Sequence, residues 1–204
     1  MIAQVTANGL SLAGLYALVA VGLTLVFGVM RILNFAHGEF VMIGAYLTYW
    51  LFALWGVDPL LSFVLVLALM ALLGALVQVT LVTRVLAAPH LNQILLTFGI
   101  AVTLQNLALV LWTGDLRAIK VWYASTALSV AGMGIPVHRV YVLAMAIGAA
   151  YAGAAGVVAS VSMFTYPLLG FLFGLKAFCV VILGGLGSVF GAVLASLFLG
   201  LVES

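Results

Sequence analysis

The residues best suited to chemistry lie close together in one short stretch, which contains Arg31, Asn34, His37 and Glu39. Charged residues make up only 5% of the chain, so this stretch concentrates ionisable groups. A histidine and a carboxylate can exchange protons or bind a polar solute. In a helix His37 and Glu39 would lie about 200° apart, so these two side chains do not form one tight site by themselves. Asn34 and His37, three residues apart, can share a helical face.

Composition indicates that lipid surrounds the elements that position these groups. The chain has 204 residues, of which 68% are hydrophobic, and its mean hydropathy is +1.44. A soluble protein carries about 25% charged residues, and 5% cannot cover a surface that faces water. Long apolar runs favour helices over barrel strands, which would alternate in short segments. We therefore predict an all-α, polytopic transmembrane helix bundle that forms a single domain, residues 1–204.

Spanning the hydrocarbon core takes roughly 20 apolar residues. Six segments qualify, although the second is short: Leu10–Met30, Phe40–Trp55, Leu60–Val82, Ile94–Trp112, Val140–Ser162 and Ala177–Leu201. The stretch Thr165–Lys176 is apolar but contains Pro167, Gly170 and Gly174. It is too short to cross, so we predict a re-entrant or interfacial half-helix there. Lys176 is expected to extend its ammonium group toward the membrane surface.

The few basic residues predict an orientation. Arg31 and Arg84 flank a hairpin of two predicted spans, which places both at the cytoplasmic side. Arg117 and Lys120 then lie outside, against the usual charge bias. Arg139 is a further cytoplasmic anchor, yet the stretch between Lys120 and Arg139 is too short and too broken to cross. Either the charge bias is weak here, or the chain lacks a span.

The polar stretch has two interpretations. Ionisable groups at membrane depth are costly and line a polar path or pair with one another, which favours a polar break beside a translocation path. The alternative is a cytoplasmic loop, with Arg31 as a basic anchor and Glu39 placed favourably at the start of a helix.

Enzyme motifs are missing. The chain has neither H-E-x-x-H nor G-x-S-x-G, and the glycines of residues 184–191 lack the Lys-Ser/Thr of a phosphate loop. We therefore expect no catalytic residues, no metal and no cofactor. The net charge of +2 is too small to indicate nucleic acid as a partner.

Three stretches resemble the inner-membrane permease of branched-chain amino-acid ABC importers. They are "NFAHGEFVMIGAY" (Asn34–Tyr46), "GLKAF" (Gly174–Phe178) and "VILGGLGSVFGAVLASLFLGLVES" (Val181–Ser204). The resemblance implies a multi-pass, all-helical subunit of the bacterial inner membrane that pairs with a second permease and two cytoplasmic ATPases. It also implies a periplasmic binding protein that delivers leucine, isoleucine, valine or a related amide. Such a permease performs no chemistry itself.

The chain departs from this family in two places. The family carries a charged cytoplasmic coupling segment ahead of Met-Gly-Ile, whereas here only "GMGIPVHRVY" (Gly132–Tyr141) is present. We therefore predict an internal deletion near residues 122–132, and the family's last span, expected after "LVES", is missing as well. The alternative function is a transport-incompetent, truncated membrane protein that only packs with partner helices.

The resemblance also implies roles for individual residues. Asn34, His37 and Glu39 match the family's polar elbow and are expected to shape the cytoplasmic end of the translocation path, with Glu39 capping the next helix. The remaining contact with the ATPase is expected at Gly134, Ile135 and Pro136.

Overall fold

The computed structural model describes residues 2–119 and 137–203, and nearly all of them lie in helices. The described elements are α1 (Ile2–Met30), α2 (His37–Trp55), α3 (Pro59–Thr80), the short 3-10 helix η1 (Val82–Val85), α4 (His90–Trp112), α5 (Val137–Ser162), α6 (Leu169–Gly184) and α7 (Val189–Glu203). In these two ranges the only extended pairing is an isolated bridge between Arg117 and Thr165. The prediction of an all-helical bundle is confirmed.

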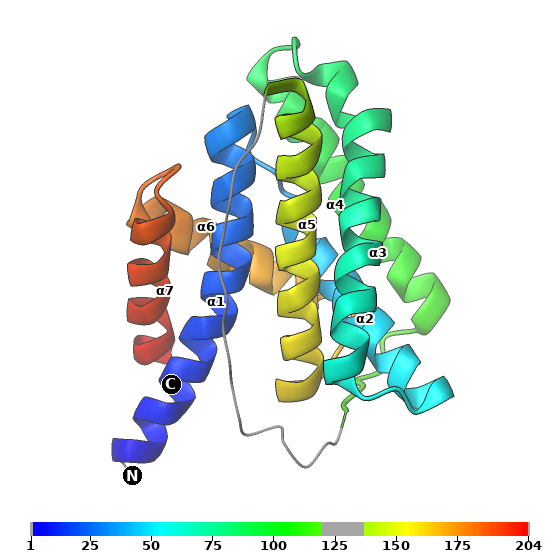
Figure 1. Cartoon of the computed structure of the whole chain (residues 1–204), viewed down its shortest axis with the longest axis vertical. Helices are drawn as coiled ribbons and strands as arrows, with labels where there is room; N and C mark the ends of the chain where they lie inside the picture. The colour runs from blue at the N-terminus through cyan, green and yellow to red at the C-terminus, as the bar shows by residue number, and fades with distance from the viewer. Residues whose placement is uncertain (1, 120–136, 204) are drawn as a thin grey trace.

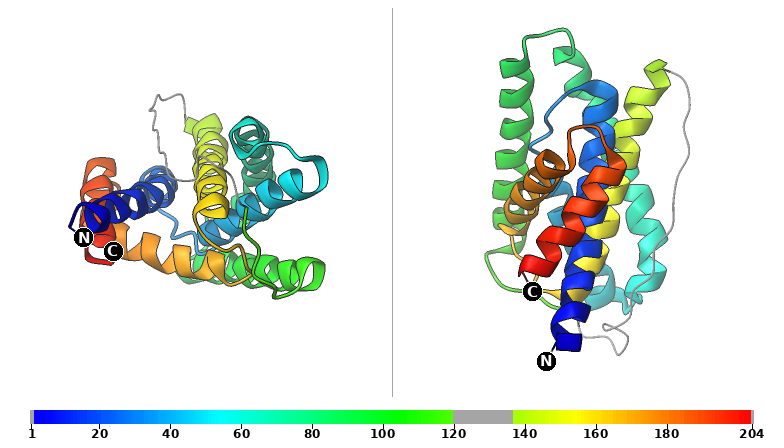
Figure 2. Two further views of the ribbon diagram at one scale, coloured as in Figure 1. Left: turned by 90° about the horizontal axis from the view of Figure 1, so that it is seen from below. Right: turned by 90° about the vertical axis from the view of Figure 1, so that its left-hand side faces the viewer.

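Helix α5 forms the centre of the bundle, with α1 on one side and α3 on the other (Figure 1). Helix α2 also packs along α5, because glycines on both helices let their backbones meet. A Cβ on Gly156 would lie 2.6 Å from the backbone nitrogen of Ala45, and a Cβ on Gly44 would lie 2.9 Å from the Cα of Gly153. The described ends of the chain, in α1 and α7, lie near each other in every view (Figure 2).

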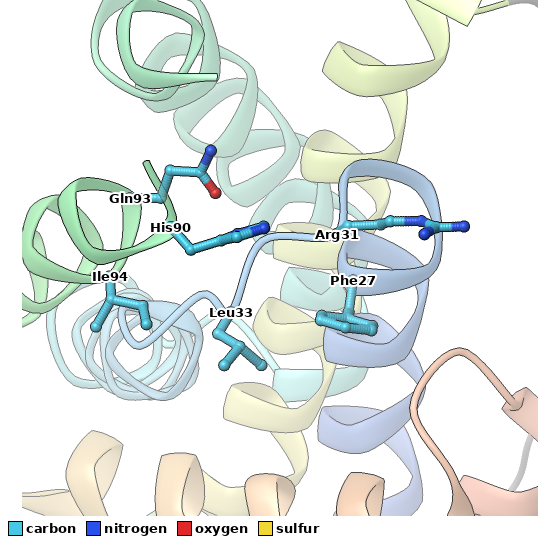
Figure 3. Close-up of a pocket in the computed structure, with 6 residues that line it drawn as sticks. All are labelled: Phe27, Arg31, Leu33, His90, Gln93 and Ile94. Atoms are coloured by element: carbon cyan, nitrogen blue, oxygen red, sulfur yellow. The ribbon is translucent and has the colours of Figure 1, made fainter. Parts of the chain in front are cut away.

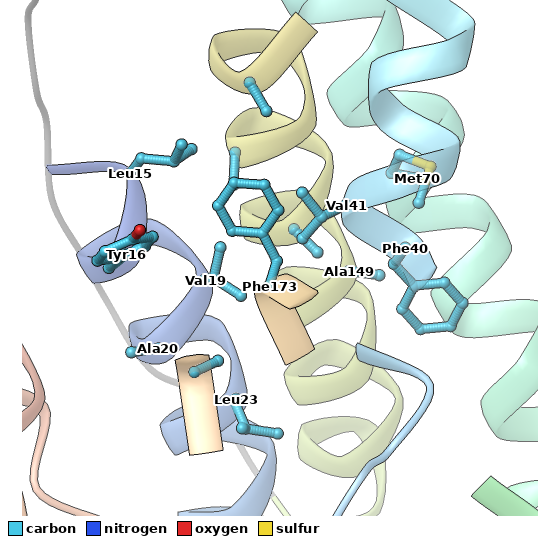
Figure 4. Packing of buried hydrophobic residues seen from close by; sticks show 14 of the residues in the cluster. Leu15, Tyr16, Val19, Ala20, Leu23, Phe40, Val41, Met70, Ala149 and Phe173 are labelled. Carbon is cyan, nitrogen blue, oxygen red and sulfur yellow. The ribbon is translucent and has the colours of Figure 1, made fainter. Parts of the chain in front are cut away.

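Large side chains fill the space between these helices (Figure 4). Tyr16 and Leu23 of α1, Phe40 of α2, Met70 of α3 and Phe173 of α6 are all buried. The outward faces of α3 and α4 are leucine-rich, and only about a fifth of each span is buried (22% and 17%). Exposed apolar faces of this size fit a multi-pass membrane protein, in which lipid or a partner helix covers them.

Among the described residues four or five candidate spans are present, and in α5 only Ile147–Ser162 bears on this number. Four described helices, α1 to α4, are long and apolar enough to cross a membrane, and α6 with α7 make a fifth if the bent pair counts as one span. The predicted span Ala177–Leu201 is not continuous, because the chain bends by 119° between α6 and α7. Gly185 and Gly187 both have φ of +89°, a backbone conformation that side chains strongly disfavour.

The predicted half-helix is wrong in its extent. Helix α6 begins at Leu169 and continues past Lys176 to Gly184, so residues expected in two separate elements form one helix. Close contact between Gly184 and Gly191 then folds α7 back against α6, since neither residue has a Cβ to keep the backbones apart.

Candidate functional site

The chain turns back into the bundle directly after α1. Arg31 has φ of 55°, unusual for a residue with a side chain, and residues 31–36 form a non-helical connection, ending in a turn at residues 35–36, that we call the elbow. Ile32, Asn34 and Ala36 of the elbow are buried, and α2 begins at His37, inside the protein. The elbow is therefore an interior segment and not a surface loop.

His37 lies beside the C-terminal half of α1. Its Nε2–H donates to the backbone oxygen of Val19 at 3.0 Å, and its ring packs on Gly22. Gly22 and Val19 precede Met30 by eight and eleven positions, which at 1.5 Å per residue is about 12–17 Å along the helix. His37 thus lies about a third of the length of α1 in from its C-terminal end, deeper than the membrane edge at which the sequence suggested the polar groups. With Nε2 protonated, Nδ1 of the neutral ring is an acceptor, and it is buried without a partner.

Neighbouring helices hold the elbow in place. The Thr97 hydroxyl of α4 donates to the Leu33 oxygen at 3.1 Å. The Phe35 ring lies 6.4 Å from Phe98 of α4 and 4.8 Å from Phe178 of α6, between ring centroids. These contacts fix a non-helical segment whose own backbone makes few hydrogen bonds.

The N-cap residue of α2 is Ala36, and no side chain caps the helix there. The Ala36 N–H donates to Asn34 Oδ1 at 3.1 Å, and the His37 N–H donates to the Asn34 backbone oxygen at 3.2 Å. A glutamate in the first turn caps a helix by accepting from that same Ala36 N–H. The expected capping by Glu39 is therefore not what the structure has.

Glu39 lies where two helices begin. It is in the first turn of α2, only 2% exposed, and its Oε2 has no hydrogen-bond partner. On its other side is Gly170, the second residue of α6, whose added Cβ would lie 2.8 Å from the Glu39 Cα. The positive ends of both helix dipoles favour negative charge at this point. Because His37 faces α1 and Glu39 faces α6, the two side chains do not form one tight site, as their spacing predicted.

A pocket of about 270 Å³ opens beside the elbow on the side of Arg31. The end of α1, the elbow and the start of α4 surround it (Figure 3). Its lining residues are Phe27, Arg31, Leu33, His90, Gln93 and Ile94.

A second polar cluster joins three distant segments. Lys176 of α6 donates to the Tyr16 hydroxyl at 2.7 Å and forms an ion pair with Glu203 of α7. The Tyr16 hydroxyl in turn donates to Glu203 Oε2 at 2.6 Å. The sequence did not predict this cluster, in which the Lys176 ammonium group is paired with Glu203 while the Lys176 side chain stays 33% exposed. The presence of one lysine and one glutamate in apolar helices was the only sequence signal.

Two predictions fall on residues that the structure does not describe. Gly134, Ile135 and Pro136, the expected contact with an ATPase, lie outside the described ranges, as does the predicted deletion near residues 122–132. Within those ranges no group of three histidine, cysteine or acidic residues could hold a metal ion.

Comparison with known proteins identifies relatives along nearly the whole chain. The family described as "Branched-chain amino acid transport system / permease component" matches residues 5–127 and 124–204. The LivH permease proteins of Salmonella typhimurium and Escherichia coli K12, from high-affinity branched-chain amino acid transport systems, are 30% identical and cover 97% of this chain and 83% of their own. The BraD permease protein of Pseudomonas aeruginosa is 27% identical, over 98% of this chain and 85% of its own. No solved structure matches.

Proposed function

Because the chain belongs to the family of permease components of branched-chain amino acid transport systems, we propose that it is the membrane-spanning subunit of an ATP-driven importer. Its cargo is leucine, isoleucine, valine or a related amide. A second permease, two cytoplasmic ATPases and a periplasmic binding protein complete the transporter in the bacterial inner membrane. ATP hydrolysis takes place on the ATPases, and this chain supplies the path.

The elbow is the part of this chain that we assign to the path. The observation that carries the assignment is the meeting of two helix N-termini, of α2 and α6, beside the buried Glu39 carboxyl group, whose Oε2 has no hydrogen-bond partner. Helices that begin inside the membrane direct free N–H groups at passing solutes in many transporters. Asn34, His37 and Glu39 are polar side chains on this path, where ionisable groups are otherwise too costly to keep.

We also propose that the chain is internally shortened near residues 122–132. Two findings support this: the family matches in two separate stretches that meet at residues 124–127, and the relatives align over 260 positions, more than the 204 residues of the chain. The lost segment is the charged one that contacts the ATPase in the family. Gly134, Ile135 and Pro136 then carry what remains of that contact, and coupling to ATP is weakened.

The same findings favour a second candidate function. A chain that has lost its coupling segment can still pack with partner helices through its apolar faces, and it then transports nothing. ATP-driven uptake distinguishes the two candidates, because only the importer subunit supports it.

Proteoliposomes test both proposals. The chain is reconstituted with the partner permease, ATPases and binding protein, in parallel with a version that carries the missing segment of the LivH relative. We expect ATP-dependent leucine uptake with the restored chain and much weaker uptake with the chain itself. Absence of uptake with both would reject the importer, and equal uptake with both would reject the weakened coupling.

A further inference from the structure

A second group of unpartnered polar atoms lies at the opposite end of the bundle. Arg117, in the loop after α4, has its guanidinium carbon 5.0 Å from the Trp50 ring centroid and 5.5 Å from that of Tyr49. One of its terminal nitrogens donates to the Trp112 backbone oxygen at 3.0 Å. The Trp112 ring stacks on Tyr46, with centroids 4.3 Å apart. We call these five residues the arginine–aromatic cluster.

Four buried polar atoms in and beside this cluster lack a hydrogen-bond partner: the Tyr46 hydroxyl, Trp50 Nε1, Arg117 Nε and the Thr165 hydroxyl. Backbone hydrogen bonds of 3.0 and 2.5 Å pair Arg117 with Thr165. Residues paired in this way have their side chains on one face, with Cβ atoms about 5 Å apart. Tyr46 and Trp50 lie one turn apart on α2 and therefore also share a face.

All four groups can donate a hydrogen bond, and the arginine and tryptophan nitrogens can only donate. Buried donors without an acceptor are costly, so their concentration here indicates an absent acceptor. The guanidinium group fits a carboxylate in particular, and a carboxylate accepts about four hydrogen bonds. The one acidic neighbour, Asp115, lies 3.8 Å from Arg117, is 75% exposed and accepts from Thr113 at 2.5 Å.

The side of the membrane on which the cluster lies indicates which carboxylate it meets. The cluster lies at the carboxyl ends of α2 and α4, whereas Arg84 lies at the far end of α3. With Arg31 and Arg84 on the cytoplasmic side, the cluster faces outside, where the cargo arrives. The Arg117 side chain is 20% exposed, so an arriving solute can reach it.

We propose that the arginine–aromatic cluster, with Thr165, is an entry site that binds the α-carboxylate of a free amino acid, while Asp115 receives its ammonium group. This rests on the proposed function, because it makes the importer's cargo the ligand. The donors that the structure leaves open then acquire their acceptor.

Tryptophan fluorescence of the full chain in lipid nanodiscs tests the proposal without any partner protein, because Trp50 and Trp112 lie in the cluster. We expect a saturable change with L-leucine and none with leucinol, which lacks the carboxylate. Arg117→Met abolishes the change, and Thr165→Val, which keeps the backbone pairing, weakens affinity about tenfold. Two control variants should keep the wild-type response. Arg84→Met makes the same change at the opposite end of the bundle, and Trp55→Phe replaces an exposed tryptophan.

Equal responses to leucine and leucinol would overturn the entry site, as would wild-type affinity in both Arg117→Met and Thr165→Val. Helix content by circular dichroism confirms that each variant is folded. If the reconstituted transporter imports leucine while the chain in nanodiscs gives no response, the entry site is wrong and the proposed function stands. A leucine response from a chain whose restored transporter imports none rejects the function and keeps the site.

Discussion

Glu39 of α2 and Gly170 of α6 meet at a point where both helices begin, so closely that a Cβ on Gly170 would lie 2.8 Å from the Glu39 Cα. The contact places a buried carboxyl group against the first turn of a second helix. It depends on glycine at position 170, since any side chain would need the space that Glu39 occupies. Together with the contact between the Phe35 and Phe178 rings, it joins the elbow and the start of α2 to α6.

Gly170→Ala is expected to separate the two helices. Overpacking of this kind costs about 1–3 kcal/mol, and we expect the melting temperature to fall by roughly 2–12 °C. Gly174→Ala is the matched control one turn later, because its Cβ would lie 3.6 Å from the Gly38 Cα, an ordinary contact. Thermal unfolding in detergent measures both variants. Equal melting temperatures of the two variants would show that the close contact at Gly170 does not contribute to stability.

Glu39→Gln tests the charge at the same position while keeping the shape of the side chain. If the carboxyl group serves the path, leucine uptake by the restored transporter falls, and the protein still assembles with its partners. His37→Ala is expected to reduce uptake too, because the ring holds the start of α2 to Val19. Normal uptake by both variants would remove the elbow from the path.

The packing of α5 on α2 gives a prediction about stability alone. A Cβ on Gly156 would lie 2.6 Å from the Ala45 nitrogen, so Gly156→Ala should lower the free energy of unfolding by about 1–3 kcal/mol. Gly99→Ala in α4 is the control, because nothing lies within 4 Å of its added Cβ. We expect no loss of stability there, measured by the same unfolding assay, and a loss equal to that of Gly156→Ala would contradict this account.

Hydropathy predicted the helices well, because a span needs about 20 apolar residues whatever its partners are. Helices α3 and α4 lie close to the predicted segments Leu60–Val82 and Ile94–Trp112. The glycines between α6 and α7 are compatible both with close packing and with a break in the helix, and the structure has the break. Local composition does not distinguish these two uses of glycine.

The candidate site was predicted in part. The residue types at positions 34, 37 and 39 indicated polar groups in an apolar setting, but their depth was not visible, because it depends on the contact of His37 with Val19 of another helix. The pairing of Lys176 with Tyr16 and Glu203 joins residues 160 and 27 positions apart. Contacts between residues so far apart in the chain cannot be predicted from a single sequence.

This ion pair yields a prediction from a double-mutant cycle. Lys176→Met leaves Glu203 without its cation, and Glu203→Gln leaves Lys176 without its anion, so each single change should destabilise the protein. Polar pairs between membrane helices contribute about 1 kcal/mol, and we expect the double variant to lose about that much less than the sum of the two. Unfolding in mixed detergent measures all four proteins, and strictly additive losses would show that the pair contributes nothing.

The arginine–aromatic cluster lies outside only if the chain has the predicted orientation in the membrane. Single-cysteine labelling tests this orientation. Cys179 is the only cysteine, so Cys179→Ser provides a background without thiols. Cysteines are then introduced at Arg84 and at Gly114, exposed positions beyond opposite ends of α4. A charged, membrane-impermeant maleimide added to intact cells should label Gly114→Cys and not Arg84→Cys, because two arginines at one end hold that end in the cytoplasm. Labelling of Arg84→Cys alone would reverse the orientation and place Arg117 on the cytoplasmic side, where an importer releases its cargo.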